Sequence, residues 1–203
     1  FKNHPSGDVD VAIDACRSAT KPHCFFGETK QGTTAIVHSL GNPDVNLVLS
    51  GGKAAPNHME GDVRAALERL AGEPELPQGL VIDCAGNANA LGDFRRQPAV
   101  AEEVCSQLRA GQRGIVGLIL ESNLVGGSQA LPMPEGEPDF GHRRRALLCG
   151  VGTGGDIGEA VRSKLRYGVS VTDPCIDWPT TVQALEKLAA AVQHRRAAAK
   201  EAA

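Results

Sequence analysis

The amino-acid sequence predicts an α/β fold in which parallel strands form a sheet covered by helices. Short runs that are apolar throughout alternate with segments whose apolar residues recur every three or four positions. Such strands are typical of parallel sheets buried on both faces. Several strands also stop at a polar residue, and these residues are Ser50, Asp83, Glu121 and Asp173. A (β/α)8 barrel, or TIM barrel, holds its active site at such strand ends, and four strand–helix units make half a barrel.

The first predicted elements follow a strand end at Phe1–Asn3. Asp8 is a candidate cap for a helix. The apolar face of this helix carries Val9, Ile13 and Cys16. Two apolar runs, His23–Phe26 and Thr33–His38, come next, and we expect them to pair as a small β-hairpin.

The central region contains two further strand–helix units. Val45–Leu49 is a compact apolar strand, and Asn57 with Glu60 approximates a capping box at the start of the helix that follows. The apolar face of that helix carries Met59, Val63, Leu67 and Leu70. Leu80–Ile82 is the next strand, and Pro98 fits the first turn of the next helix. The apolar face of this second helix carries Val100, Val104 and Leu108.

The last region begins with the clearest buried strand, Ile115–Leu120, and a shorter strand is expected at Val169–Val171. Trp178 and Pro179 open the final helix. Its expected apolar face carries Val182, Leu185, Leu188 and Val192. The Arg/Ala/Lys-rich tail after His194 is expected to fray into solvent.

Composition excludes some classes of function. The chain has 203 residues and a net charge of −3, which argues against a general nucleic-acid or membrane-surface binder. No apolar run reaches the ~18 residues that a membrane span needs. The six cysteines form neither a C-x-x-C pair nor a zinc-finger pattern, so they indicate buried thiols in a reducing compartment, and we expect a cytoplasmic protein.

Several segments, in order, resemble the type I 3-deoxy-D-arabino-heptulosonate-7-phosphate (DAHP) synthases. They are Phe-Lys-Asn at 1–3, a hairpin at 34–37 that resembles part of the feedback-inhibitor site of regulated members, Gly-Gly-Lys at 51–53, Glu-Ser-Asn-Leu at 121–124 and Tyr-Gly-Val-Ser-Val-Thr-Asp at 167–173. The resemblance implies the C-terminal half of a TIM barrel.

This half would be one partial barrel domain over residues 1–203, made of strand–helix units five to eight. The resemblance is interrupted by an unmatched insertion at 139–164, a stretch that has no counterpart in the family. It is either a true surface insertion or translated intron sequence, and we hypothesise the second. Because an isolated half exposes sheet edges that the other half would close, we expect the chain to be poorly soluble or to self-associate.

The resemblance implies an aldol-like condensation. Phosphoenolpyruvate and erythrose 4-phosphate combine to DAHP and phosphate, the first step of the shikimate route to aromatic amino acids. Lys2 matches a phosphoenolpyruvate-binding lysine, and Glu121 and Asp173 match two ligands of a divalent metal. Carboxylates suit such a cation, which could polarise the aldehyde oxygen of the sugar phosphate. The full-length form is expected to be a homo-oligomer.

The sequence departs from the family at two site positions. Ser50 replaces an arginine that contacts phosphate, so it offers one hydrogen bond and no charge. Asn87 stands at or near the place of a metal-binding histidine, and an amide oxygen is the weaker ligand for transition metals. The resemblance also implies an N-terminal half with further substrate-binding residues, which we expect this chain to lack. We therefore expect the fragment alone to be inactive, because half a site cannot preorganise the transition state.

Two other interpretations remain open. A degenerate, non-catalytic barrel with a regulatory or interaction role would account for the lost arginine and histidine. A G-x-G-x-x-G pattern at Gly150, Gly152 and Gly155, with Asp173 about 20 residues downstream, instead matches an NAD(P)-binding dehydrogenase. Without the family context, a carboxylate at a strand end is more often a helix cap or a solvated charge.

Overall fold

The computed structural model describes residues 1–53, 55–86, 88–131 and 162–201. The chain divides into two compact units. The first unit consists of Phe1–Leu120 and Thr180–Ala203, and the second of Glu121–Pro179. No helix in the described ranges is long and apolar enough to cross a membrane.

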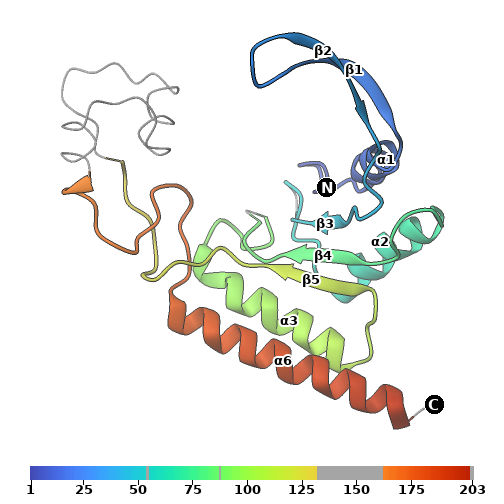
Figure 1. The fold of residues 1–203 in the computed structure, drawn as a ribbon. Coiled ribbons are helices and arrows are strands. Elements are labelled where there is room, and N and C mark those ends of the chain that lie inside the picture. The colour runs from blue at the N-terminus through green and yellow to red at the C-terminus, as the bar shows by residue number, and fades with distance from the viewer. Residues whose placement is uncertain (54, 87, 132–161, 202–203) are drawn as a thin grey trace. The chain divides into compact units, whose positions relative to one another are not determined.

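The centre of the first unit is a parallel sheet (Figure 1). Its strands are β3 (Leu47–Leu49), β4 (Leu80–Asp83) and β5 (Ile115–Ile119), hydrogen-bonded in the order β3-β4-β5. Lys2 adds a parallel bridge to Val48, on the far side of β3 from β4. The parallel α/β architecture expected from the sequence is confirmed. Lys2 pairs with β3 as the last residue of a further parallel strand would.

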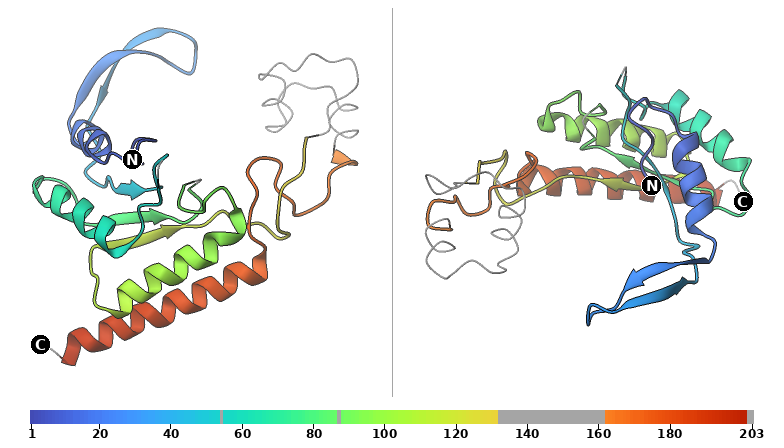
Figure 2. Two further views of the ribbon diagram at one scale, coloured as in Figure 1. Left: turned by 180° about the vertical axis from the view of Figure 1, so that it is seen from behind. Right: turned by 90° about the horizontal axis from the view of Figure 1, so that it is seen from above.

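Four helices in the described part of the chain pack with this sheet: α1 (Asp10–Ala19), α2 (Glu60–Ala71), α3 (Gln97–Arg109) and α6 (Trp178–Glu201). A short 3-10 helix, η1 (Phe94–Arg96), leads into α3, and Pro98 lies in the first turn of α3 as expected. Figure 2 shows α3 and α6 running alongside each other. Lys187 of α6 and Glu102 of α3 form an ion pair of 2.9 Å.

The helices and one face of the sheet share a single apolar core. The strand residues that belong to it are all less than 5% exposed, and they are Leu47, Leu49, Leu80, Ile82 and Ile115. Neighbouring residues point to the other face, where Val116 is 61% exposed. The sheet is therefore fully covered by helices on one face only among the described residues of this unit.

The predicted hairpin is confirmed. Strands β1 (His23–Glu28) and β2 (Thr34–Ser39) pair antiparallel, with Phe26 opposite Ile36. Both side chains are largely exposed, as are most others of the hairpin. The hairpin therefore owes its form to backbone pairing more than to burial.

The second unit is held by isolated bridges and turns. Ser122 pairs with Ile176, Gly127 with Cys175 and Ser128 with Ser170. The prediction of a regular strand at Val169–Val171 is wrong, because Ser170 makes only a single bridge and the chain then bends. A strand needs a neighbour that pairs with it over several residues, and the described chain offers none here.

Neither predicted helix start has the expected cap. The N-terminal cap residue of α1 is Val9, which makes no side-chain cap, although Asp8 Oδ1 accepts a hydrogen bond of 2.9 Å from the Asp10 amide. The prediction of a capping box at Asn57 and Glu60 is wrong, because the N-terminal cap residue of α2 is Met59, whose side chain makes no capping hydrogen bond. The Asn57 side chain bonds to another loop instead.

The buried face of α6 agrees with the prediction in part. Leu188 and Val192 are half-buried against the core, as expected. The fully buried residues, however, are Thr181, Ala184 and Ala191, whereas Leu185 is 46% exposed. Small side chains let two helices approach closely, so they take the contact positions in place of the leucine. The prediction that the tail after His194 frays is also wrong, because α6 continues to Glu201. Alanines favour the helix there, and the Arg195 side chain donates a hydrogen bond to the Gln112 carbonyl.

Candidate functional site

A cavity of about 810 Å³ opens at the carboxyl ends of the strands in the first unit. It lies where Lys2, the loop after β3 and the loop after β4 come together. Its lining consists of Lys2, Asn3, Pro5, Ser50, Gly51, Gly52, Lys53, Ala55, Ala88, Leu91 and Gly92. Ligands of α/β proteins bind at such strand ends, because the loops there supply polar groups on a rigid sheet. Lys2 and Ser50, both proposed from the sequence, thus line one cavity.

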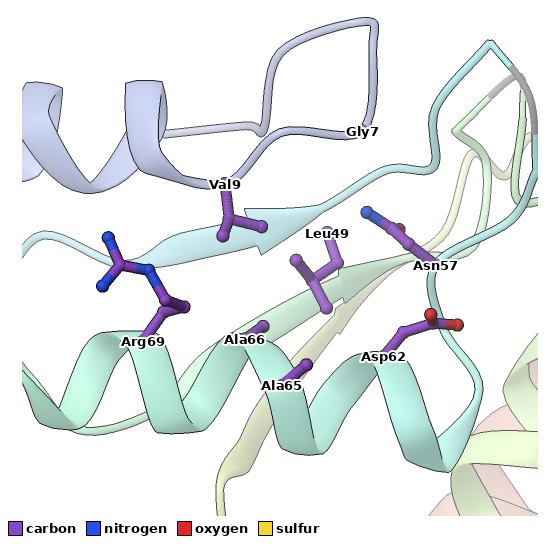
Figure 3. Close-up of a pocket in the computed structure, with 8 residues that line it drawn as sticks. All are labelled: Gly7, Val9, Leu49, Asn57, Asp62, Ala65, Ala66 and Arg69. Carbon is purple, nitrogen blue, oxygen red and sulfur yellow. The ribbon is translucent and has the colours of Figure 1, made fainter.

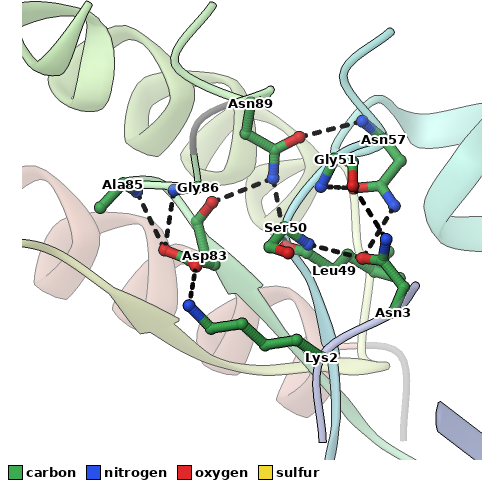
Figure 4. A network of polar contacts seen from close by, with 10 residues as sticks. All are labelled: Lys2, Asn3, Leu49, Ser50, Gly51, Asn57, Asp83, Ala85, Gly86 and Asn89. Atoms are coloured by element: carbon green, nitrogen blue, oxygen red, sulfur yellow. Dashed lines mark hydrogen bonds and ion pairs between the residues drawn. The ribbon is translucent and has the colours of Figure 1, made fainter. Parts of the chain in front are cut away.

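Lys2 is paired with a buried carboxylate. Its ammonium lies 2.6 Å from Asp83 Oδ2, and the side chain of Asp83 is only 2% exposed (Figure 4). The other carboxylate oxygen, Oδ1, accepts hydrogen bonds from the amides of Ala85 and Gly86. These contacts hold the Asp83 carboxylate in place and position the Lys2 ammonium beside the end of β4.

Three asparagines tie the strand ends together (Figure 4). Asn3 Oδ1 accepts from the Ser50 amide at 2.8 Å, and Asn3 Nδ2 donates to the Gly51 carbonyl at 2.8 Å. Asn57 Oδ1 accepts from the Gly51 amide at 2.7 Å, while Asn57 Nδ2 donates to Asn3 Oδ1 at 3.2 Å. The loop after β3 is therefore held by Asn3 near the chain start and by Asn57 before α2.

Asn89 joins this network to β4. It is 1% exposed, and its Nδ2 donates to the carbonyls of Leu49 and Asp83, at 3.1 and 2.9 Å. Its Oδ1 accepts from the Asn57 amide at 2.9 Å. An amide side chain has both donors and acceptors, so it can satisfy the last carbonyls of two strands and still bond to a third segment.

Two glycines allow the loops to meet. Gly51 has a φ of +82°, and a Cβ added there would lie 2.5 Å from the Cβ of Ala88. A Cβ at Gly86 would lie 2.5 Å from the Ser50 carbonyl oxygen. Both positions require glycine because real Cβ contacts are longer. At the rim, Leu91 has a φ of 52°, a conformation that is strained for a side-chain-bearing residue.

Cys84 follows Asp83 and lies fully buried. Burial, reinforced by the negative charge of Asp83, raises the pKa of the Cys84 thiol to about 12. At neutral pH this thiol is protonated and behaves as a small apolar side chain. It is therefore a core residue and not a nucleophile.

A second, smaller cavity of about 200 Å³ lies between the loop before α1, β3 and α2 (Figure 3). Apolar side chains, including Val9 and Leu49, form part of its lining, and Asp62 and Arg69 lie along α2. Arg69 is engaged with Asp10 at 2.7 Å. We assign no ligand to this cavity.

The two carboxylates proposed as metal ligands, Glu121 and Asp173, belong to the second unit. Burial raises the pKa of the Cys175 thiol, and the charges of Glu121 and Asp173 add to this rise, although a hydrogen bond with Ser170 opposes it. Both carboxylates therefore act on one thiol and lie in its neighbourhood. The Glu121 carbonyl also accepts from the Ile176 amide at 3.0 Å.

The third proposed metal ligand, Asn87, lies outside the described residues and stays untested. The glycine pattern at 150–155, which suggested NAD(P) binding, and nearly all of the 139–164 insertion also lie outside them. Within the described ranges, no group of three or more His, Cys, Asp or Glu side chains is placed to hold a metal ion.

Sequence reasoning missed the network beneath the cavity. It marked Asp83 as a strand end but did not pair it with Lys2, and it gave Asn57 a capping role. Asn3 and Asn89 received no role at all. The usable signal was local, since each of these residues lies at or shortly after an apolar strand end, where carbonyls are left without strand partners.

Comparison with known proteins gives one consistent family. The sequence model of the DAHP synthetase I family matches residues 1–186. The phospho-2-dehydro-3-deoxyheptonate aldolase of Corynebacterium glutamicum is 38% identical over 98% of this chain and 48% of its own length. The Tyr-sensitive enzyme of that name from Escherichia coli is 39% identical over 93% of this chain and 44% of its own.

A solved structure agrees with these sequence matches. Phospho-2-dehydro-3-deoxyheptonate aldolase from Francisella tularensis superposes with a TM-score of 0.76 at 35% identity. The match covers 96% of this chain and 48% of that one. The chain thus spans about half the length of the curated relatives it matches.

Proposed function

The chain belongs to the DAHP synthetase I family, and on this premise we propose that it forms the C-terminal half of a TIM barrel that condenses phosphoenolpyruvate with erythrose 4-phosphate. The products are DAHP and phosphate, and the reaction opens aromatic amino acid biosynthesis. The whole of 1–203 is one partial barrel domain in this proposal, with strand–helix units five to eight and an insertion at 139–164.

The observation that carries the proposal is the cavity at the strand ends. Lys2 and Ser50 both line it, on a sheet whose strands are parallel and follow one another in chain order. That arrangement fits half of a (β/α)8 barrel, in which substrates bind at the carboxyl ends of the strands.

The residues of the cavity bind and orient substrate in this proposal. The Lys2 ammonium attracts the anionic groups of phosphoenolpyruvate as a point charge, and Asp83 holds it in place. The Ser50 hydroxyl donates one hydrogen bond. Orientation of two bound reactants is itself a large part of catalysis, because it removes translational and rotational entropy before the reaction.

Glu121 and Asp173 would hold the divalent metal, with Asn87 as a third and weaker ligand. Their neighbourhood around Cys175 fits this role only in part, because two carboxylates are fewer ligands than a resident metal needs. When bound, the ion would act as a Lewis acid on the aldehyde oxygen of erythrose 4-phosphate.

The test is reconstitution with a complementary half. The chain alone should form no DAHP, whereas a complex with the N-terminal half of the Corynebacterium glutamicum relative and a divalent metal should form DAHP and release phosphate. In that complex, Glu121→Ala and Asp173→Ala should weaken Mn²⁺ binding measured by calorimetry. The matched control Glu68→Gln, on the exposed face of α2, should leave it unchanged.

A non-catalytic role is the second candidate. The observation that favours it is the lack of a three-ligand metal cluster within the described ranges. A stable complex of the two halves that binds phosphoenolpyruvate but yields no DAHP at any metal concentration would establish this alternative.

We also propose that the full-length form is a cytoplasmic homo-oligomer. Size-exclusion chromatography of the full-length form would test its oligomeric state.

A further inference from the structure

One face of the β1–β2 hairpin carries a cysteine and a histidine side by side. Cys24 of β1 lies opposite His38 of β2 in the antiparallel register, and the Cys24 Sγ atom is 4.0 Å from His38 Nε2. Both residues are exposed. Neither side chain forms another hydrogen bond with a described residue. Two metal-binding atoms are therefore adjacent and accessible, on residues that do not line the cavity at the strand ends.

The base of the hairpin is tied to the C-terminal end of α1. The ring of His23, the first residue of β1, donates from Nε2 to the Ser18 carbonyl at 2.8 Å. After β2, the Asn42 amide donates to the Ala19 carbonyl, also at 2.8 Å. The cysteine and the histidine of the pair lie close to this anchored base. Their positions are therefore largely fixed before any ligand binds, and such preorganisation lowers the entropy cost of binding.

The spacing of the two atoms suits a tetrahedral zinc ion. Zinc binds a thiolate at about 2.3 Å and an imidazole nitrogen at about 2.0 to 2.1 Å, so a tetrahedral angle places sulfur and nitrogen about 3.6 Å apart. The observed 4.0 Å between Sγ and Nε2 reaches this value through a small side-chain rotation. A thiolate with an imidazole also favours zinc over magnesium and calcium, which prefer oxygen ligands.

The neighbours of the pair on this face are apolar. Phe26 follows Cys24 two positions along β1, and Ile36 precedes His38 two positions along β2. Side chains two positions apart on a strand point to the same face, so these four side chains share one face of the hairpin. Apolar groups around a metal site limit solvent access and lower the local dielectric. Both effects strengthen the attraction between a thiolate and a divalent cation.

We infer that Cys24 and His38 form a zinc-binding site on the hairpin, separate from the metal site of the proposed condensation. The ion displaces the thiol proton, which passes to solvent, and binds Sγ and Nε2. Two protein ligands leave two of the four positions to water, so the ion exchanges readily and is no resident cofactor. A bound ion links β1 to β2 through side chains, and an isolated two-stranded hairpin has little stability of its own.

The test is a titration of the full chain with Zn²⁺ and with Co²⁺ in the presence of a phosphine reductant. Cobalt bound to a thiolate shows charge-transfer absorption, which we expect in the parent chain and which added zinc should abolish by displacement. Cys24→Ser should remove this absorption. Cys24→Ser and His38→Gln should each weaken zinc binding by about tenfold or more. Because both positions are exposed, neither change should disturb the fold, and circular dichroism would check this.

Two variants serve as matched controls. His23→Gln removes a histidine of the same strand whose ring is bonded to the Ser18 carbonyl. Cys175→Ser removes the next most exposed of the described cysteines. Both variants should retain the cobalt absorption and the zinc affinity of the parent chain.

A parent chain without charge-transfer absorption overturns the inference, and so does absorption that persists in Cys24→Ser. Zinc affinity that is unchanged in His38→Gln overturns it as well. The stoichiometry is measured by analytical ultracentrifugation with zinc. One zinc per chain supports the site with two water ligands, whereas one zinc per two chains shows that a second copy replaces the waters at the same site. The absorption should be unchanged in Glu121→Ala and Asp173→Ala, so this inference and the proposed function can fail independently.

Discussion

Asn3 and Asn89 at the strand ends are 6% and 1% exposed, whereas Phe26 and Ile36 of the β1–β2 hairpin are 80% and 61% exposed. These polar residues are buried because the ends of β3 and β4 leave backbone groups that need hydrogen-bond partners, and the two asparagines supply them. The hairpin pairs its own backbone, so its apolar side chains can lie in solvent. At the cavity of this chain, polar side chains are therefore buried because backbone groups need them as hydrogen-bond partners.

Asn89→Ala should give the largest effect. The change removes the four hydrogen bonds of the fully buried amide, with the Leu49 and Asp83 carbonyls, the Asn57 amide and His58 Nδ1. The free energy of unfolding should fall by about 3 to 5 kcal/mol in urea denaturation. Asn42→Ala, which removes one exposed turn contact, is the control and should cost below about 1 kcal/mol. Equal losses in the two variants would contradict the importance of the buried network.

Lys2→Met should have the next largest effect. It leaves the buried Asp83 carboxylate without its cation, although the Ala85 and Gly86 amides still contact it. We expect a loss of about 2 kcal/mol, less than for a fully buried pair because Lys2 is half exposed. In a double-mutant cycle, Asp83→Asn should recover part of this loss in the Lys2→Met background. Purely additive losses would show that the pair contributes nothing.

The Cys84 thiol predicts a pH dependence. Its pKa rises from 9.0 to about 12 in the fold, so between these values the folded state binds more protons than the unfolded state. Stability should therefore fall as pH rises from 9 toward 12, by about 1 to 2 kcal/mol between pH 9 and 11. Cys84→Ala should lack this part of the decline. Parallel pH profiles for the parent chain and Cys84→Ala would contradict the assigned cause.

The hairpin should give the smallest effect. Phe26→Ser changes a side chain that is 80% exposed and that pairs across the strands only with exposed Ile36. The free energy of unfolding should change by at most about 0.5 kcal/mol. A loss above about 2 kcal/mol would show that the hairpin is buried against other protein in solution, and analytical ultracentrifugation of both proteins would then identify self-association.

Much of the fold follows from the sequence. Three parallel strands, their helices and the hairpin were predicted because apolar periodicity and turn residues are local signals. The errors arose where a distant partner decided the outcome. Asn57 resembles a helix cap in sequence, but the Gly51 amide and Asn3 compete for its side chain. Leu185 resembles a core residue, but close contact with α3 selects alanine on the neighbouring face.

The sequence by itself determined the family and the positions of Lys2, Ser50, Glu121 and Asp173 along the chain, because ordered motifs survive in a single sequence. Only the tertiary structure decided which residues meet. It brought Lys2 and the loop that carries Ser50 to one cavity, and it paired Lys2 with Asp83, which lies 81 residues away in sequence. The physical reason is that strand pairing brings distant loops to one edge of the sheet, and charge in a cavity depends on those neighbours.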